Sequence, residues 1–253
     1  VSHTGGLAGA GLSTELIFKK TGLITFRDEE EMCQAAIAFA TQPVPKGRRV
    51  GVITDTGGPA IIATDELIDG GLEMPPISEK AIQDLSEKLY PEAAIGNPID
   101  VLATANASHW RAAIDTWMEE DHIDSVYLNF VTPPFVDCEA VAKEMAKVNS
   151  QQIKPIVCNY MTDKSQWIET TKILKDGGIP CYDFPEMAAK ALAALCRYSD
   201  IRKRDKGKIK VFNDVDKQKA EGIIEAAQSA GRTNLGAAEV YDLLAAYKIP
   251  VVD

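Results

Sequence analysis

The sequence predicts an α/β fold built on a doubly wound, mostly parallel sheet. Strand-length runs of nearly continuous apolar residues recur along the chain, as in 50–54 and 125–131. Segments with helical spacing of apolar residues separate these runs, and glycine and proline mark the changes between them. Strands that are apolar on both faces belong to a parallel sheet covered by helices on both sides. Right-handed crossovers then wind such a sheet in both directions.

The first 46 residues are expected to form the end of an incomplete domain. Residues 12–21 are predicted as a short helix or turn, and residues 22–26 as a short strand. Asp28 is expected to cap a helix that continues to about residue 40, with three glutamates in its first turn. The segment 42–47 contains two prolines and a glycine and is predicted to be a linker.

Residues 47–203 are predicted to form one flavodoxin-like domain, in which strands and helices alternate. Strands are expected at 50–54, 72–74, 100–102, 125–131, 155–160 and 179–182. Helices are expected at 59–68, 78–89, 108–118, 138–149, from 163 or 165 to 177, and 185–201. Gly70-Gly71 suits the end of a helix, and Pro185 suits the start of one.

The last part of the chain, 204–253, is predicted to be a linker followed by the start of another domain. The basic residues of 202–210 indicate a solvated connector rather than a binding patch. Residues 216–230 form one predicted helix, the segment 235–239 leads into a second, and 248–252 is a predicted strand.

Composition excludes several classes of function. The hydrophobic and charged contents of 45% and 25% are those of an ordinary soluble globule. A net charge of −10 argues against general affinity for nucleic acid, and no apolar run reaches the length of a membrane span. Five separated cysteines suit reduced thiols in a cytoplasm, and with three histidines we expect no metal site. The chain begins with Val1 inside a motif, so we expect a longer polypeptide.

The N-terminal stretch, residues 1–11, places His3 among small residues and glycines. A neutral imidazole in a glycine-rich loop can attack a phosphoryl group and carry it between sites. On composition alone, a polar and frayed N-terminus is the favoured interpretation of this stretch, because one histidine near glycines is a weak signal.

The segment 54–60, Thr-Asp-Thr-Gly-Gly-Pro-Ala, joins the first strand of the domain to its first helix. Thr56, Gly57, Gly58 and Ala60 would bring free backbone N–H groups to a helix start, with Pro59 as the first helical residue. Such a terminus attracts phosphate through its dipole and its orphan donors. The alternative is a tight turn with no ligand. Asp55 either faces away and caps the helix, or it weakens phosphate affinity.

A third segment, 96–101, places Asn97 and Asp100 in a turn before a short strand, at the same carboxyl edge of the sheet. Thr132-Pro133-Pro134 follows the central strand and could line the same crevice, where open α/β sheets bind ligands. An Asn-Pro turn capped by Asp100, and a plain loop at 132–134, are the alternatives.

These segments together resemble the NDP-forming acyl-CoA synthetases, relatives of succinyl-CoA synthetase. Residues 2–9 resemble the phosphohistidine loop of that family, and 54–60 and 96–101 follow in the expected order. The resemblance implies that His3 is catalytic, that Thr56, Gly57, Gly58 and Ala60 bind phosphate, and that Asn97 and Asp100 border the active site. The family form has Asn-Ala before Gly-Gly-Pro and often glycine after it, so this sequence departs from it at positions 55, 56 and 60.

The resemblance also implies a reaction and partners. Acyl-CoA, ADP and phosphate would be interconverted with carboxylic acid, CoA and ATP. Residues 1–46 would end a succinyl-CoA ligase-like domain, and 204–253 would begin an ATP-grasp domain. In the full-length enzyme, CoA and ATP/ADP with Mg would be bound by a CoA-binding domain upstream and the ATP-grasp domain downstream. Either domain would lie in the same chain or in a partner subunit. This chain alone would bind none of them tightly. The expected protein is a cytoplasmic homo-oligomer acting on acyl-CoA or an organic acid, without nucleic-acid or membrane partners.

Two other functions are compatible with the sequence. Similar regions occur fused to protein-lysine acetyltransferases as non-catalytic regulatory modules, which the departure at Asp55 would suit. A flavodoxin-like binding module is the third interpretation, although no acidic-aromatic flavin loop supports it. The sequence has no GxSxG elbow and no P-loop lysine motif.

Overall fold

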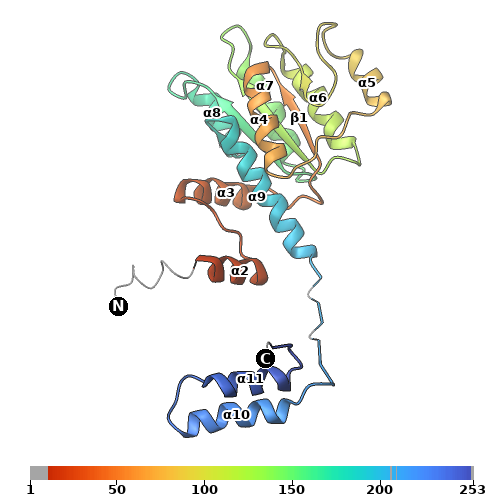
Figure 1. Cartoon of the computed structure of the whole chain (residues 1–253). Coiled ribbons are helices and arrows are strands. Elements are labelled where there is room, and N and C mark those ends of the chain that lie inside the picture. Colours follow the sequence, from red (N-terminus) through yellow and green to blue (C-terminus); the bar gives the residue numbers. More distant parts are fainter. Residues whose placement is uncertain (1–10, 206, 209, 252–253) are drawn as a thin grey trace. The chain divides into compact units, whose positions relative to one another are not determined.

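A computed structural model describes residues 11–205, 207–208 and 210–251 of the chain (Figure 1). The chain divides into two compact units, with the boundary between Arg204 and Asp205. Each unit is described here by itself.

The first unit is built on a five-stranded sheet in which every pair of neighbouring strands is parallel. The strand order is β2-β1-β3-β4-β5, which is the flavodoxin-like order of a doubly wound sheet. The predicted fold class is therefore confirmed. The strands are β1 (Val50–Thr54), β2 (Ile99–Asp100), β3 (Ser125–Val131), β4 (Ile156–Met161) and β5 (Cys181–Tyr182).

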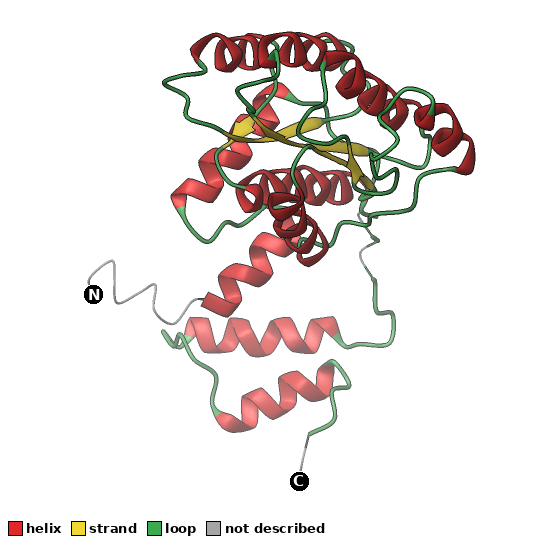
Figure 2. Ribbon diagram, turned by 90° about the horizontal axis from the view of Figure 1, so that it is seen from above, coloured by secondary structure: helices red, strands yellow, loops and turns green. Residues whose placement is uncertain are grey.

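Helices cover both faces of this sheet, as the two rows of helices around the strands in Figure 2 show. Helices α6, α7 and α8 pack in sequence on one face, with α5 beside α6, whereas α4 and α9 pack together on the other. Their bounds are α4 (Gly57–Asp69), α5 (Glu79–Ser86), α6 (Ala107–Glu119), α7 (Cys138–Asn149), α8 (Ile168–Asp176) and α9 (Pro185–Lys203).

The first unit has two hydrophobic cores, one on each face of the sheet, and alternate side chains of the buried strands belong to one or the other. Val52, Tyr127 and Val157 belong to the core under α4 and α9, while Leu128 and Cys158 belong to the core under α6 and α7. Because successive side chains of a strand point to opposite faces, a continuous apolar run fills both layers. This explains why these strands are recognisable in the sequence.

One glycine lets a helix approach the sheet closely. A Cβ atom at Gly51 of β1 would lie 2.4 Å from Cδ2 of Trp117 in α6. The indole contacts the strand there, and its Nε1–H donates to the Val52 carbonyl at 3.2 Å. The close packing of α6 on β1 therefore depends on the missing side chain at position 51.

The N-terminal part of the first unit is helical. Helix α2 (Gly11–Thr21) is followed by α3 (Glu29–Thr41), whose N-cap Asp28 accepts the Glu31 N–H at 2.8 Å, and α3 packs on α9. The strand predicted at 22–26 is wrong, because no strand forms there. A strand needs a neighbour to bond with, and the described residues bring none to this segment.

Three further predictions need correction. The strand predicted at 72–74 is only an isolated bridge between Arg49 and Glu73. Helix α8 begins at Ile168, later than the predicted 163 or 165. Helix α4 begins at Gly57, so Pro59 is its third residue and not its first.

The second unit contains helices α10 (Lys217–Ser229) and α11 (Ala237–Ala246). Arg232 and Glu239 form a bidentate pair with both distances at 2.7 Å, and Glu239 also accepts the Gly236 N–H. No strand forms at 248–251, contrary to the prediction for 248–252, because this unit offers no described strand to pair with. None of the helices in the described parts of the chain is long and apolar enough to cross a membrane.

Candidate functional site

The turn between β1 and α4 is held by the hydroxyl of Thr54. This oxygen accepts the Thr56 N–H at 3.0 Å, and its own proton is donated to the Thr56 carbonyl at 2.7 Å. From β3, the Asn129 amide donates to the same hydroxyl at 2.9 Å and to the Thr56 carbonyl at 3.3 Å. The Thr54 hydroxyl and both polar backbone groups of Thr56 are thus occupied.

Helix α4 begins directly after this turn with unoccupied donors. Thr56 is its N-cap, and no side chain accepts a hydrogen bond from the first turn. The first-turn residues that carry an N–H are Gly57, Gly58 and Ala60, since Pro59 has none. A Cβ atom at Gly57 or Gly58 would meet nothing within 4 Å, so the helix start is not crowded at these two residues. Thr56 therefore does not bring a free donor, contrary to the prediction, because its N–H is used by the Thr54 hydroxyl, whereas Gly57 and Gly58 keep theirs.

Asp55 faces away from this helix terminus. Each of its carboxylate oxygens accepts the Val131 N–H at 3.2 Å, and 5% of the residue is exposed. The expectation that Asp55 caps the helix is wrong, because Thr56 occupies the cap position. Burial raises the pKa of Asp55 to about 7, against the lowering effect of the hydrogen bonds from Val131 and Thr56.

The segment 97–100 brings one of its two predicted residues to the site. Asp100 and Pro98 line a pocket of about 350 Å³ together with Gly57 and Ala60 of α4. Its other lining residues are Thr54, Ile61, Thr64 and Asp65. Because this lining contains two carboxylates and no basic side chain, an anion bound here would be held by backbone N–H groups and the helix dipole.

Asn97 has a different role. Its Oδ1 accepts the Val52 N–H at 3.0 Å, and its Nδ2 donates to the carbonyls of Val50 and Pro75 at 2.8 and 2.9 Å. The amide of Asn97 is thus fully engaged in hydrogen bonds to the backbone of β1 and Pro75. It does not line the pocket. Thr132, Pro133 and Pro134 do not line it either.

Two buried asparagines, which the sequence analysis did not identify, support the turn through side-chain hydrogen bonds. Thr54, Asn129 and Asn159 are register partners on β1, β3 and β4. Asn159 donates through Nδ2 to Oδ1 of Asn129, and both asparagines are fully buried. An asparagine inside each of two otherwise apolar strands was the available signal, because buried amides need partners.

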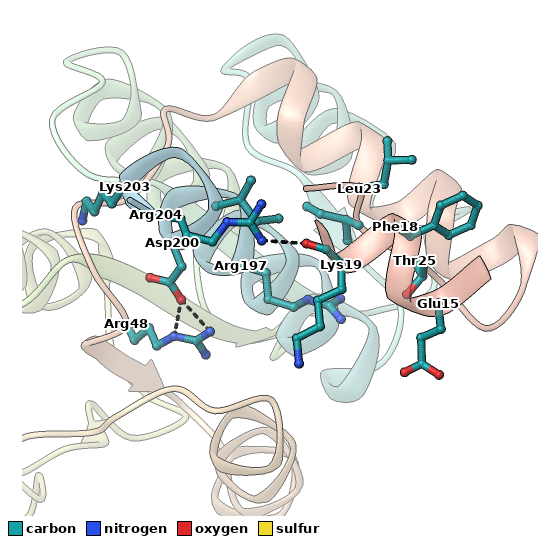
Figure 3. Close-up of a pocket in the computed structure, with 12 residues that line it drawn as sticks. Glu15, Phe18, Lys19, Leu23, Thr25, Arg48, Arg197, Asp200, Lys203 and Arg204 are labelled. Atoms are coloured by element: carbon teal, nitrogen blue, oxygen red, sulfur yellow. Dashed lines mark hydrogen bonds and ion pairs between the residues drawn. The ribbon is translucent and has the colours of Figure 1, made fainter. Parts of the chain in front are cut away.

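Neither His109 and His122 nor a larger pocket provides a second candidate functional site. His109 accepts the Asn106 N–H through Nδ1 at the start of α6, and His122 pairs with Glu120. A pocket of about 570 Å³ lies between α2, residues 23–25 and α9 (Figure 3). Its Arg48 pairs with Asp200, and its Arg204 donates to the Lys19 carbonyl, so these cations stabilise the fold. This pocket shares no residue with the α4 turn.

Two further points of the sequence analysis concern His3 and a metal site. His3 lies outside the described residues. Within the described residues, no three His, Cys, Asp or Glu side chains are grouped so that they could hold a metal ion.

Comparison with known proteins identifies relatives of this chain. Residues 50–204 match the family of the Ligase-CoA domain. The chain is 33% identical over 204 residues to the alpha subunit of acetate–CoA ligase [ADP-forming] II from Pyrococcus furiosus, covering 77% of this chain and 43% of that subunit. It is 29% identical over 252 residues to 4-hydroxybutyrate–CoA ligase [ADP-forming] from Nitrosopumilus maritimus, covering 99% of this chain and 36% of the relative. The chain therefore spans less than half the length of either relative.

Solved structures share the fold. The crystal structure of PH0766 from Pyrococcus horikoshii OT3 superposes with a TM-score of 0.71 at 29% identity, covering 77% of this chain and 45% of that one. A dinucleotide-forming acetyl-coenzyme A synthetase from Ca. Korarchaeum cryptofilum, solved in complex with phosphate and ADP, gives 0.70 at 23% identity. That superposition covers 80% of this chain and 46% of the synthetase chain.

Proposed function

This chain belongs to the Ligase-CoA domain family, and from that premise we propose that it is the phosphate-relay part of an ADP-forming acid–CoA ligase. The whole protein would interconvert acyl-CoA, ADP and phosphate with a carboxylic acid, CoA and ATP. The relatives from Pyrococcus furiosus and Nitrosopumilus maritimus are both named ADP-forming CoA ligases, which favours this function over a regulatory region of an acetyltransferase fusion.

The observation that carries the proposal is the open first turn of α4. Two N–H groups without a helical partner, on Gly57 and Gly58, begin a helix of 13 residues beside a pocket at the carboxyl edge of the sheet, and Ala60 lines that pocket. Partial positive charge from the helix dipole and these donors suits a phosphoryl group in transfer. Asp100, which was predicted to border the active site, also lines this pocket.

His3 would carry the phosphoryl group between substrates. A neutral imidazole nitrogen attacks the phosphorus of an acyl phosphate, a P–N bond forms, and the carboxylate of the organic acid leaves. A terminal phosphate oxygen of ADP then attacks the same phosphorus, which breaks the P–N bond and yields ATP. The amides of the α4 turn would hold the phosphoryl oxygens during this exchange.

The other components are proposed to lie in the rest of the enzyme. Residues 1–46 would complete a succinyl-CoA ligase-like domain, 47–203 would form the ligase domain, and 204–253 would open an ATP-grasp domain. CoA and the nucleotide with its Mg²⁺ would be held by the CoA-binding and ATP-grasp domains, in the same chain or in a partner subunit. A cytoplasmic homo-oligomer is the proposed assembly.

Phosphorylation of the full-length protein tests the proposal. Incubation with ATP labelled at the γ-phosphate should give an acid-labile, base-stable phosphoprotein, and His3→Asn should abolish the label. His109→Asn is the matched control and should label normally, since its ring caps a helix far from the turn in sequence. Equal labelling of His3→Asn and wild type would refute the assignment.

A further inference from the structure

Cys158 of β4 and Cys181 of β5 face each other across neighbouring strands. They are register partners in a parallel pair. Neighbouring strands lie about 4.8 Å apart, and this separation falls within the range of about 4.4–6.8 Å between the Cα atoms of cysteines that form a disulfide. The sheet therefore already holds the two backbones at a spacing that suits a disulfide.

Both side chains also lie on the same face of the sheet. Cys158 belongs to the hydrophobic core under α6 and α7, and Cys181 packs against that core. Burial raises the pKa of Cys158 well above its ordinary value, and a side-chain hydrogen bond with Cys181 raises it further. The two thiols therefore lie beside each other. Neither distant Cα atoms nor diverging Cβ atoms, the two obstacles to a disulfide, apply to this pair.

The two cysteines differ in their access to solvent. Cys158 is fully buried, whereas Cys181 is partly exposed. Strand β5 is the last in the order of the sheet, so no strand among the described residues covers its outer side. A small oxidant can therefore reach Cys181 from the edge of the sheet, while the core shields Cys158 from direct attack.

The fold, and not the distance along the chain, selects this pair. Cys181 lies closer in sequence to Cys196 than to Cys158, so loop closure in an unfolded chain would favour a bond between Cys181 and Cys196. In the folded chain Cys196 belongs to the core on the opposite face of the sheet. Cys33 is exposed on α3, and Cys138 lies on α7. Cys158 is thus the partner that the sheet register assigns to Cys181.

We propose that Cys158 and Cys181 are a redox modification site, at which a peroxide converts the two thiols into a reversible disulfide. The Cys181 thiolate attacks one oxygen of hydrogen peroxide, the O–O bond breaks, and the departing hydroxide is protonated to water. The Cys158 sulfur then attacks the sulfenic acid on Cys181. An S–S bond forms, the S–O bond breaks, and the thiol proton of Cys158 leaves with the oxygen as a second water.

The step is balanced, because the two thiols lose two electrons and the peroxide gains them. A small dithiol returns the pair to its reduced form by thiol–disulfide exchange. The site is independent of the proposed phosphate relay, since neither cysteine lines the pocket beside α4.

Peptide mapping of the folded 253-residue chain tests the pairing. After brief treatment with hydrogen peroxide and alkylation of the remaining thiols, mass spectrometry should find the peptides of Cys158 and Cys181 joined by one disulfide. Dithiothreitol should separate them again. The same oxidation in urea is the control for chain statistics, and there this pairing should lose its preference.

Variants test the order of the two steps. In Cys158→Ala the sulfenic acid on Cys181 has no partner, so its adduct with dimedone should be at least about tenfold more abundant than in the wild-type chain. In Cys181→Ala the partly exposed thiol is missing, and Cys158 should stay reduced. Cys33→Ala removes an exposed thiol outside the pair, and it should leave the yield of the disulfide unchanged.

The wild-type map alone can overturn the proposal. Cys181 that stays reduced in peroxide would show that the sheet edge is not accessible. Cys181 that is oxidised to a sulfinic acid, or joined to another cysteine, would show that the register does not bring the two sulfur atoms together. Equal pairing in the folded and the unfolded chain would show that the fold does not select the pair. A disulfide between Cys158 and Cys181 that forms in the folded chain and loses its preference in urea supports the site.

Discussion

Thr54 and Asn129 are register partners on adjacent parallel strands, and the Asn129 amide donates to the Thr54 hydroxyl at 2.9 Å. This bond links the middle of the sheet to the start of α4. The hydroxyl in turn fixes both polar backbone groups of Thr56. The direction in which the first N–H groups of α4 point is thus set by an amide on the neighbouring strand.

Replacement of that amide should destabilise the first unit. Asn129→Leu removes both donors to the turn and leaves the Asn159 amide without its acceptor. We expect a loss of about 2–4 kcal/mol in the free energy of unfolding, since each buried polar group left unpaired costs about 1–3 kcal/mol. Gln83→Leu on the exposed side of α5 is the control and should stay within about 0.5 kcal/mol. Equal denaturation midpoints for Asn129→Leu and wild type would exclude a supporting role.

Charge at Gly58 should separate binding from folding. Gly58 is the second residue of α4, it has no positive φ, and a Cβ there meets no atom within 4 Å. Gly58→Asp should therefore fold normally and gain about 0.3–1 kcal/mol from the helix dipole. In the full-length enzyme it should lose most phosphotransfer, because its carboxylate occupies the anion site. Gly58→Ala is the uncharged control and should lose far less. Normal phosphotransfer by Gly58→Asp would show that the turn is only a connector.

The contact between Gly51 and Trp117 predicts a purely structural effect. In Gly51→Ala the new methyl group would overlap the indole, at 2.4 Å from Cδ2. We expect a loss of about 1–3 kcal/mol, typical of overpacked cores. Trp117→Phe makes room, so the double variant should lose less stability than the sum of the two single changes. Additive losses in chemical denaturation would indicate that the two residues act independently.

The pair of Arg49 and Asp124 predicts weaker folding in acid. Burial by itself raises the pKa of Asp124, but hydrogen bonds from the Arg49 side chain and backbone outweigh it, and the pKa lies below its ordinary value of 3.8. Because the folded pKa is depressed, this stabilisation is present above about pH 4 and is lost as the pH falls through the folded pKa. Asp124→Asn should cost about 1–2 kcal/mol at pH 7 after allowance for the partly exposed Arg49, and it should flatten this acid limb. Asp115→Asn is the control, because the Asp115 side chain is 39% exposed against 3% for Asp124, and it should leave the acid limb unchanged.

Much of the fold was predictable because local and global signals agree. The bounds of β3 and α7 match the predicted 125–131 and 138–149. Both are apolar at the positions that the two cores require, and both are flanked by clear turn or cap residues. The strands predicted at 22–26 and 248–252 fail for the opposite reason. Their β-branched and aromatic residues favour extended backbone, but a strand exists only with a neighbour, and that neighbour is not encoded in the segment.

The site was predictable only in part. The donors of the α4 turn follow from local sequence, because two glycines after a strand leave N–H groups free. The roles of Asn97, Asp55 and Asn129 depend on neighbours distant in the chain, such as Val131 for Asp55. Asn97 was predicted from its motif to border the active site, but its side-chain amide forms hydrogen bonds to the backbone of β1. Position 129 carried no motif signal, yet it supports the turn.

The side chain of Asn97 completes the hydrogen bonding of one edge of β1. Strand β1 pairs with β2 only at Ile53 and Thr54. The other half of that edge is closed by the Glu73 carbonyl on the Val50 N–H, by the Asn97 amide, and by the Trp117 indole on the Val52 carbonyl. A row of free backbone groups at this position would template intermolecular β-pairing. Asn97 therefore occupies backbone groups of β1 that another chain could otherwise pair with, so a β2 strand of only two residues is sufficient at this side of the sheet.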